Sequence, residues 1–369
     1  MGGPGGEYLE FWTRSGPVLY RPASLPELRS ADALMLDCDG TIVDVRRSYL
    51  EAAVETARIL AALSGRRLPP RPALAGLVPA LKESGLLNND WDTAAALYAA
   101  WAMHVDGGVP LEDAAPRTAS AGIDGIYEAA ARAGGLDLGR CPGPPPGCRV
   151  SAVFDSIYYG AALYREIYSA DPPVPLDRGL MEDESLIVGP ADLRALAARA
   201  GGAVAIVTGR PRSAVRGPLG ELLRSVAGGR VVHAGESGHP KPDPTPLLLA
   251  ASALGSRSPI YVGDSPEDLM MAEASRGLGL RTSFVGVYGA SLDPARSIGW
   301  FASRGAAAIA PSPAELGLLI YRGAADGPPE GRLLRGHAPQ EGLRLPGIPP
   351  GPGPEVRHRQ VVAHRPGHL

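Results

Sequence analysis

Short, continuously apolar runs alternate with helix-like stretches along most of this chain. Runs of this kind lack the polar–apolar alternation of a half-exposed strand, so they suit strands covered on both faces. Helical patterns lie between successive runs, as at Pro246–Leu254 and Glu267–Ser275, which is typical of a parallel α/β sheet. The sequence therefore predicts an α/β fold. Its candidate strands are Ala33–Asp37, Ala203–Thr208, Arg230–Ala234, Pro259–Gly263 and Ser283–Val287, with Ala306–Ala310 as a sixth.

One long interval interrupts this alternation. The first apolar run ends at Asp37 and the second begins at Ala203, a separation far beyond an ordinary crossover connection. Helical periodicity fills much of the interval, so we expect an inserted α-helical domain at 47–183, within an α/β core formed by 30–46 and 184–322. The helical stretches are Tyr49–Leu63, Trp91–Val105 and Ser156–Ser169.

A Gly- and Pro-rich loop, 133–147, separates the last two helical stretches. Cys141 and Cys148 bracket the sequence CPGPPPGC at its end. We expect two loop thiols here, with a local disulfide as the less favoured alternative.

The two ends of the chain differ from its middle. Residues 323–369 contain nine Pro and nine Gly in 47 residues and no aromatic residue. Such a composition buries too little apolar surface to offset the entropy of ordering, so it predicts a disordered tail. The segment 1–29 carries Tyr8, Phe11, Trp12 and Tyr20, which predict a strap packed on the core.

Composition excludes several kinds of partner. The formal net charge is −3, from 36 basic and 39 acidic residues, which argues against nucleic acid or an anionic membrane. No apolar run approaches the ~18 residues of a membrane-spanning helix, and the N-terminus lacks the layout of a secretory signal. Three cysteines cannot build a disulfide framework, so we expect a cytoplasmic protein. We further expect a monomer or a homodimer.

An acidic motif, Asp37–Thr41 (DCDGT), follows the first apolar run directly. Side chains two residues apart leave a strand on the same side, about 6.5–7 Å apart along it. Asp37 and Asp39 are therefore placed to act as a nucleophile and as a proton donor to a leaving group. An acidic turn is the structural alternative.

The second motif, Thr208–Pro211 (TGRP), ends the second apolar run. A hydroxyl group and free backbone N–H groups at a strand-to-helix junction can bind phosphate oxygens, with Pro211 opening the helix. Taken alone, however, this motif is better explained as an N-cap threonine.

The third motif, Lys241–Leu247 (KPDPTPL), holds one of the only two lysines of the chain, the other being Lys82. Its prolines fix a helix entry with Asp243 as the expected N-cap. A compact charge that binds a phosphoryl oxygen would explain a lysine at this position. A surface lysine is the alternative.

The fourth motif, Gly263–Leu269 (GDSPEDL), places Asp264 at a strand end and Asp268 over the start of the next helix. Hard carboxylate oxygens in this arrangement suit Mg²⁺. Ser265 as N-cap with Asp268 at the third helical position also resembles a capping box, and Asp268 could serve both purposes.

Together, the four motifs lie where an open α/β sheet binds its ligands, beyond the carboxyl ends of the strands. Their order, DxDGT, a threonine, KPxPxPL and GDxxxD, resembles the haloacid dehalogenase (HAD) superfamily of aspartyl-phosphate hydrolases over about 30–322. The helical insert between the first two motifs is similar to the cap of subfamily I, the phosphoglycolate-phosphatase-like group. The resemblance implies a Rossmann-like core with a helical cap. It also implies a Mg²⁺-dependent phosphatase acting on a small phosphorylated metabolite.

The resemblance further implies a role for each motif residue. Asp37 would be the nucleophile that takes the phosphoryl group, and Asp39 the general acid and then the general base. Thr208 would hold the transferring phosphoryl group, and Lys241 would neutralise its charge.

The same resemblance implies the binding residues around this set. Gly209 and Arg210 would bind substrate beside the threonine. Mg²⁺ would be held by Asp37, the Asp39 carbonyl and Asp264, with Asp268 binding directly or through water.

Other functions remain open on sequence grounds. A phosphomutase of the β-phosphoglucomutase type shares both aspartates and all four motifs. A dehalogenase is disfavoured, because Asp39 would have no leaving group to protonate. An inactive binding module is least favoured, since no motif residue is missing.

One segment of the insert gathers rare residues. Lys82, Asn88 and Asn89 include one of the two lysines and both asparagines of the chain. Residues 86–92 are similar to a cap segment in a small clade of the same group, so we expect this region to read the substrate's leaving group. The alternative is a helix start, with Asn89 or Asp90 capping a helix anchored by Trp91.

Overall fold

The computed structural model describes residues 8–82, 87, 89–134, 136–227, 230–234, 236 and 238–320. The segment for which composition predicts disorder, 323–369, lies outside the described residues, and that expectation stays a prediction. The chain divides into two compact units. The α/β unit comprises 1–43, 186–210 and 217–369, and the helical unit comprises 44–185 and 211–216.

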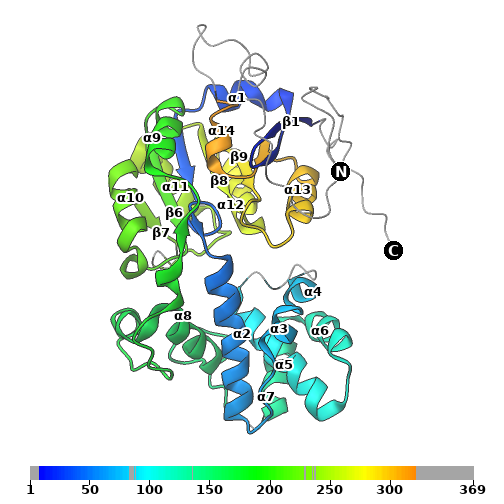
Figure 1. Ribbon diagram of the computed structural model, residues 1–369. Coiled ribbons are helices and arrows are strands. Elements are labelled where there is room, and N and C mark those ends of the chain that lie inside the picture. Colours follow the sequence, from blue (N-terminus) through cyan, green and yellow to red (C-terminus); the bar gives the residue numbers. More distant parts are fainter. Residues whose placement is uncertain are drawn as a thin grey trace, which may run out of the picture. The chain divides into compact units, whose positions relative to one another are not determined.

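The α/β unit is built on an eight-stranded sheet with the order β1-β2-β10-β9-β8-β3-β6-β7 (Figure 1). From β10 to β7 every neighbouring pair is parallel. Most of these strands are buried along their whole length, as expected for strands covered on both faces. The predicted α/β fold is confirmed. The parallel strands are β3 (Ala33–Leu36), β6 (Val204–Thr208), β7 (Val231–His233), β8 (Pro259–Gly263), β9 (Ser283–Val287) and β10 (Ala308–Ala310).

The N-terminal segment contributes to the sheet itself. β1 (Leu9–Thr13) and β2 (Gly16–Tyr20) form an antiparallel hairpin, and β2 pairs antiparallel with β10, so the sheet is mixed. Tyr8 is buried and its hydroxyl donates to the Ala306 carbonyl at 2.6 Å, whereas Trp12 is 67% exposed. The region expected as a strap is thus a strand hairpin, followed by η1 (Pro22–Ser24) and α1 (Leu25–Arg29).

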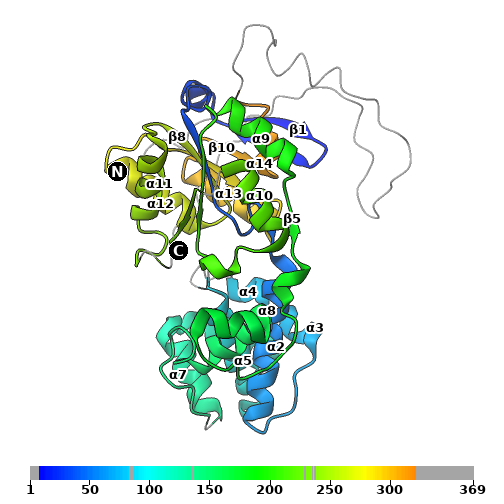
Figure 2. The same cartoon turned by 90° about the vertical axis from the view of Figure 1, so that its left-hand side faces the viewer.

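Helices cover both faces of the sheet (Figure 2). On one face, α11, α12 and α13 share a core cluster with strand side chains such as Met35, Val207 and Tyr261. On the other face, α9 packs against α10 and α14. The bounds are α9 (Pro190–Arg199), α10 (Gly217–Ala227), α11 (Thr245–Leu254), α12 (Pro266–Gly277), α13 (Pro294–Ser303) and α14 (Pro313–Leu316).

The helical unit is organised around α5 (Asp90–Gly107), which is buried on all sides from Thr93 to Ala102. Alanine fills most of that stretch, and its small side chain allows α2, α6 and α7 to pack closely against α5. The remaining elements are α2 (Arg46–Leu63), α3 (Arg71–Ala75), α4 (Val78–Lys82), α6 (Leu111–Ser120), α7 (Gly122–Gly134), α8 (Arg149–Tyr168), η2 (Leu180–Asp183) and η3 (Arg212–Ala214). Where the chain passes from one unit to the other, β4 (Val43–Asp44) and β5 (Ser185–Leu186) form a two-stranded pair.

The long helix α8 is broken at Gly160, which has φ 73° and ψ 167°. A Cβ atom at this position would lie 2.7 Å from the backbone nitrogen of Gly179. Position 160 therefore favours glycine for two reasons: its φ is positive, and the backbone of Gly179 leaves no space for a side chain.

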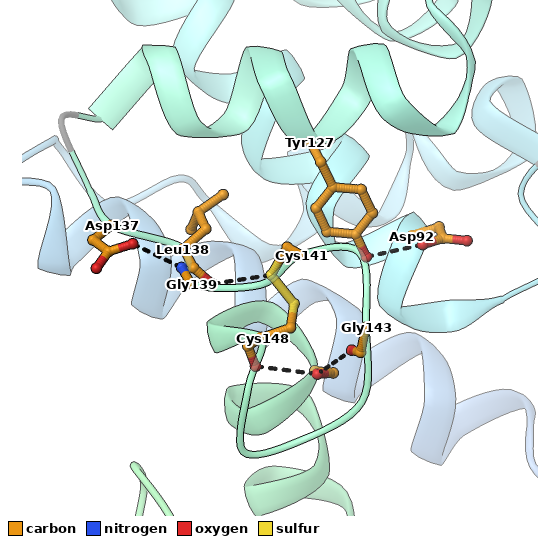
Figure 3. Close-up of a disulfide and its surroundings, with 9 residues drawn as sticks. Asp92, Tyr127, Asp137, Leu138, Gly139, Cys141, Gly143 and Cys148 are labelled. Carbon is orange, nitrogen blue, oxygen red and sulfur yellow. Dashed lines mark hydrogen bonds between the residues drawn. A yellow bond between two sulfur atoms is a disulfide. The ribbon is translucent and has the colours of Figure 1, made fainter.

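The structure corrects the expectation of two free thiols in the 133–147 loop. Cys141 and Cys148 form a disulfide (Figure 3). The loop is also closed by main-chain hydrogen bonds, from Arg140 N–H to the Gly147 carbonyl at 2.8 Å and from Arg149 N–H to the Leu138 carbonyl at 2.9 Å. These contacts bring the two sulfur atoms together, which spacing in the sequence alone does not reveal.

Candidate active site

Three adjacent parallel strands, β8, β3 and β6, carry the candidate site. Asp37 follows β3, Thr208 ends β6, and Asp264 follows β8. Because these strands run in the same direction, their carboxyl ends meet at one edge of the sheet. This edge brings together motif residues that are widely separated in the sequence.

An acidic cluster forms at this edge, with Asp37 and Asp268 buried and Asp264 partly buried. Asp37, Asp264 and Asp268 each offer a carboxylate oxygen, and these oxygens all lie within 4.8 Å of one another. Two glycines make the arrangement possible. A Cβ at Gly40, where φ is +72°, would lie 2.0 Å from Asp264 Oδ2, and one at Gly263 would lie 2.5 Å from Asp268 Cβ.

Burial and mutual repulsion make the carboxylates of this cluster costly to ionise together, even with Lys241 beside them. Burial raises the pKa of Asp37 to about 7, with Lys241 opposing the shift and the neighbouring carboxylates adding to it. Burial and the charges of Asp37 and Asp268 likewise raise the pKa of Asp264 well above its usual value. A cluster of hard oxygen ligands that is costly to ionise together fits a divalent cation.

Lys241 brings a positive charge to this acidic cluster. Its Nζ donates to Asp37 Oδ1, and to Asp268 Oδ1 at 2.7 Å. Although burial disfavours the charged ammonium group, Asp268 and Asp37 raise the pKa of Lys241 well above its usual value. Lys241 is therefore a cation held between Asp37 and Asp268.

Asp268 is fully buried and caps the start of α12, one of the two roles expected of it, while metal binding by its carboxylate stays a prediction. Ser265 is the N-cap of α12, and the reciprocal capping box between Ser265 and Asp268 is present, as the sequence predicts. Its Oδ2 accepts from Ser265 Oγ at 2.7 Å, and its Oδ1 accepts from the Tyr261 hydroxyl at 2.6 Å. Burial would raise the pKa of Asp268, but Lys241 and these hydrogen bonds lower it.

Tyr261 was not among the residues chosen from the sequence. It lies in the middle of β8, and both its ring and its hydroxyl are buried. The sequence does contain a feature that could have indicated Tyr261: it is a hydroxyl-bearing residue in an otherwise apolar strand, three positions before Asp264.

The second motif lies beside Asp39. Thr208 is fully buried, and its Oγ1 accepts from the Arg210 N–H at 3.0 Å. Arg210 Nε donates to Asp39 Oδ1 at 2.5 Å. Gly209 is exposed, and a Cβ there would meet nothing within 4 Å. The expected helix opening at Pro211 is wrong, because Pro211 precedes only the short η3 turn, and α10 begins at Gly217.

The third motif enters its helix one residue later than expected. Pro244, not Asp243, is the N-cap of α11, and Asp243 Oδ1 accepts from the Thr245 N–H at 2.8 Å. Asp243 therefore still accepts a hydrogen bond from a backbone N–H at the start of α11, although it lies one residue before the N-cap.

The contacts around 82–92 match the helix-start interpretation. Asn89 is the N-cap of α5, and its side chain accepts from the Trp91 N–H at 2.9 Å. Trp91 Nε1 donates to the buried Asp155 at 2.9 Å. Asp92 accepts from Tyr127 at 2.9 Å (Figure 3). Lys82 ends α4, but its side chain and Asn88 lie outside the described residues.

Among the described helices, none has both the length and the apolar character required to cross a membrane.

Comparison with known proteins agrees with this geometry. The haloacid dehalogenase-like hydrolase family model matches residues 176–276. An imidazoleglycerol-phosphate dehydratase from Phytophthora nicotianae is 27% identical over 241 residues, which are 64% of this chain. The chain spans only 40% of the length of that relative.

Two solved structures are similar to this chain. A structural-genomics target is 15% identical, with a TM-score of 0.53, covering 77% of this chain and 97% of its own. Phosphatase Tt82 from Thermococcus thioreducens is 24% identical, with a TM-score of 0.45, covering 69% of this chain and 92% of its own. The first likeness supports the fold. The mixed sheet and the four motifs at its edge agree with the match of residues 176–276 to the haloacid dehalogenase-like hydrolase family model.

Proposed function

We propose that this protein is a Mg²⁺-dependent phosphatase that hydrolyses a small phosphorylated metabolite through an aspartyl-phosphate intermediate. The observation that supports this most strongly is the placement of Asp37. This carboxylate is buried at the edge of the sheet, it contacts Lys241, and it lies within an acidic cluster suited to a divalent cation. A nucleophilic carboxylate needs such surroundings, because it must approach a phosphate dianion of like charge.

The metal would be held by Asp37, Asp264 and the backbone carbonyl of Asp39. Asp268, whose oxygens already accept from Lys241, Tyr261 and Ser265, would act through the lysine or through a bridging water. A bound Mg²⁺ supplies positive charge that reduces repulsion between the nucleophile and the phosphate group.

The chain's own residues account for both steps of hydrolysis. A carboxylate oxygen of Asp37 attacks phosphorus, the bond from phosphorus to the ester oxygen breaks, and Asp39 gives its proton to the departing alcohol. Asp39 then takes a proton from water. That water attacks the aspartyl phosphate, frees Asp37 and releases inorganic phosphate. Thr208, Gly209 and Lys241 bind the phosphoryl oxygens throughout.

A panel of phosphate esters, assayed with Mg²⁺ and with a chelator, tests this proposal. The panel should include 2-phosphoglycolate, a hexose phosphate and p-nitrophenyl phosphate. It should also include imidazoleglycerol phosphate, because the matched relative is named for that compound. We expect Mg²⁺-dependent release of phosphate. Movement of the phosphoryl group between hydroxyls without release would instead identify a phosphomutase, and no reaction with any ester would contradict both.

The Asp37→Asn variant links the activity to this site. An amide is a poor nucleophile and metal ligand, so we expect turnover to fall below measurement while the protein keeps its fold. Asp192→Asn is the matched control, because Asp192 is an exposed carboxylate in the first turn of α9. Activity of Asp37→Asn within tenfold of the unmodified protein would contradict a covalent mechanism.

A further inference from the structure

We propose that Arg210 is a positioning residue for Asp39, holding this carboxylate at the place where it exchanges a proton with the substrate's leaving oxygen. The inference rests on the proposed phosphatase activity. It gives Arg210 a different role from the substrate contact that the family resemblance implies.

The main observation is a buried ion pair across the site. Arg210 Nε donates to Asp39 Oδ1 at 2.5 Å, and the arginine side chain is 4% exposed against 23% for Asp39. The guanidinium group is thus enclosed, and the carboxylate is the more accessible member of the pair. A charge-assisted hydrogen bond of this kind is both stronger and more directional than a neutral one.

The main chain of Arg210 is also fixed on both sides. Its N–H donates to Thr208 Oγ1 at 3.0 Å, and its carbonyl lies 2.8 Å from Nδ1 of His233 on β7. The arginine is therefore anchored to the ends of two neighbouring strands before its side chain reaches Asp39. An anchored, planar guanidinium limits where the carboxylate can lie, which a flexible lysine ammonium cannot reproduce.

This arrangement has a specific chemical consequence. Proton transfer to a leaving group depends on placement, and an error of about 1 Å can cost roughly 100-fold in rate. An alkyl alcohol leaves only with a proton, whereas p-nitrophenolate leaves readily without one. Loss of Arg210 should therefore harm alkyl phosphates far more than p-nitrophenyl phosphate.

The quantity that isolates this effect is kcat/KM, because it covers only the steps up to departure of the alcohol. For Arg210→Gln we expect kcat/KM to fall roughly 30-fold or more on the best alkyl ester of the panel. On p-nitrophenyl phosphate we expect a fall of less than about threefold. Arg276→Gln, at an exposed arginine in the last turn of α12, is the matched control and should change neither value.

A double-mutant cycle with Asp39→Asn completes the test. If Arg210 acts through Asp39, adding Arg210→Gln to Asp39→Asn should cost nothing further on the alkyl ester. The double variant also removes both members of a buried ion pair, so it keeps the test available if Arg210→Gln alone fails to fold. In that case Arg210→Lys, which retains the charge, serves as the single variant.

Equal losses on both esters, a rise in KM alone, or additive losses in the cycle would overturn the inference and return Arg210 to substrate binding. Activity of the unmodified protein is measured first. If it hydrolyses no ester, the proposed function fails, and this outcome is distinct from failure of the role given to Arg210.

Discussion

Tyr261 shows how a residue with no place in the reaction can control residues that have one. Its hydroxyl donates to the same oxygen of Asp268 that accepts from Lys241 Nζ, and the lysine lies 5.9 Å from the centre of the tyrosine ring. One phenol group therefore supports both the carboxylate and the cation that contacts Asp37.

The variant Tyr261→Phe removes this hydroxyl while keeping the ring. We expect a loss of about 1 kcal/mol of unfolding free energy, the usual value of one hydrogen bond, together with a several-fold lower kcat on p-nitrophenyl phosphate. Tyr288→Phe is the matched control, because the Tyr288 hydroxyl also donates one hydrogen bond, at 2.7 Å, but to the Pro17 carbonyl rather than to a motif residue. Similar stability losses with equal kcat values would show that Tyr261 supports only the fold.

Gly209 allows a test of phosphoryl binding that leaves the fold undisturbed. A methyl group there meets no atom within 4 Å, and the position does not need a left-handed backbone. We expect Gly209→Ala to unfold at the same temperature as the unmodified protein but to raise KM about tenfold, because the methyl group would occupy space needed by a phosphoryl oxygen. An unchanged KM would place the phosphoryl group elsewhere.

At the scale of elements, α8 combines a break with a buried acid. Asp155, before the break at Gly160, accepts hydrogen bonds from Trp91 of α5 and from Tyr168 at the end of the same helix. One carboxylate therefore connects both halves of α8 to the start of α5. Burial raises the pKa of Asp155 to about 7, although both hydrogen bonds oppose the shift.

The raised pKa of Asp155 predicts a dependence of stability on pH. Between about pH 4 and pH 7 the folded protein keeps a proton on Asp155 that the unfolded chain has lost, so stability falls as pH rises through this range. The total loss of unfolding free energy is roughly 1.4 kcal/mol for each unit by which the pKa of Asp155 in the folded protein exceeds its pKa in the unfolded chain. Thermal unfolding of Asp155→Asn across this range should lack that decrease, and the difference from the unmodified protein removes contributions from other acids. Parallel curves would contradict this assignment.

At the scale of the whole molecule, the terminal segment beyond the described residues gives a simple expectation. Residues 323–369 lack the composition to form a core, so their deletion should change the unfolding free energy by about 0.5 kcal/mol or less and leave turnover unchanged. Calorimetry and the ester assay measure both quantities. A decrease of several degrees in the melting temperature would show that this segment packs against the rest of the chain.

The sequence predicted the elements whose burial leaves a pattern and missed contacts made between distant residues. Strand β8 was correct to the residue, because both of its faces are covered. The hairpin β1-β2 was missed, since its place depends on pairing with β10 at the other end of the domain. The same limit applies to Arg210 and Asp39, which lie 171 residues apart and meet only because β6 pairs with β3. The chemistry of each motif could be predicted from the sequence, but the residue that each side chain contacts could not.

The path of the chain after Arg210 has a mechanical consequence. The segment 211–216 belongs to the helical unit, where Arg216 pairs with Glu166, so the polypeptide leaves the α/β unit at Pro211 and returns at Gly217. The proline ring locks φ at the exit, whereas Gly217 has φ +54° and tolerates a wide range of rotation at the return. The segment 211–216 therefore begins at a residue with a restricted backbone and is followed by one with a permissive backbone. Proline thus fixes the backbone directly after Arg210, whereas glycine leaves the backbone at 217 free to rotate.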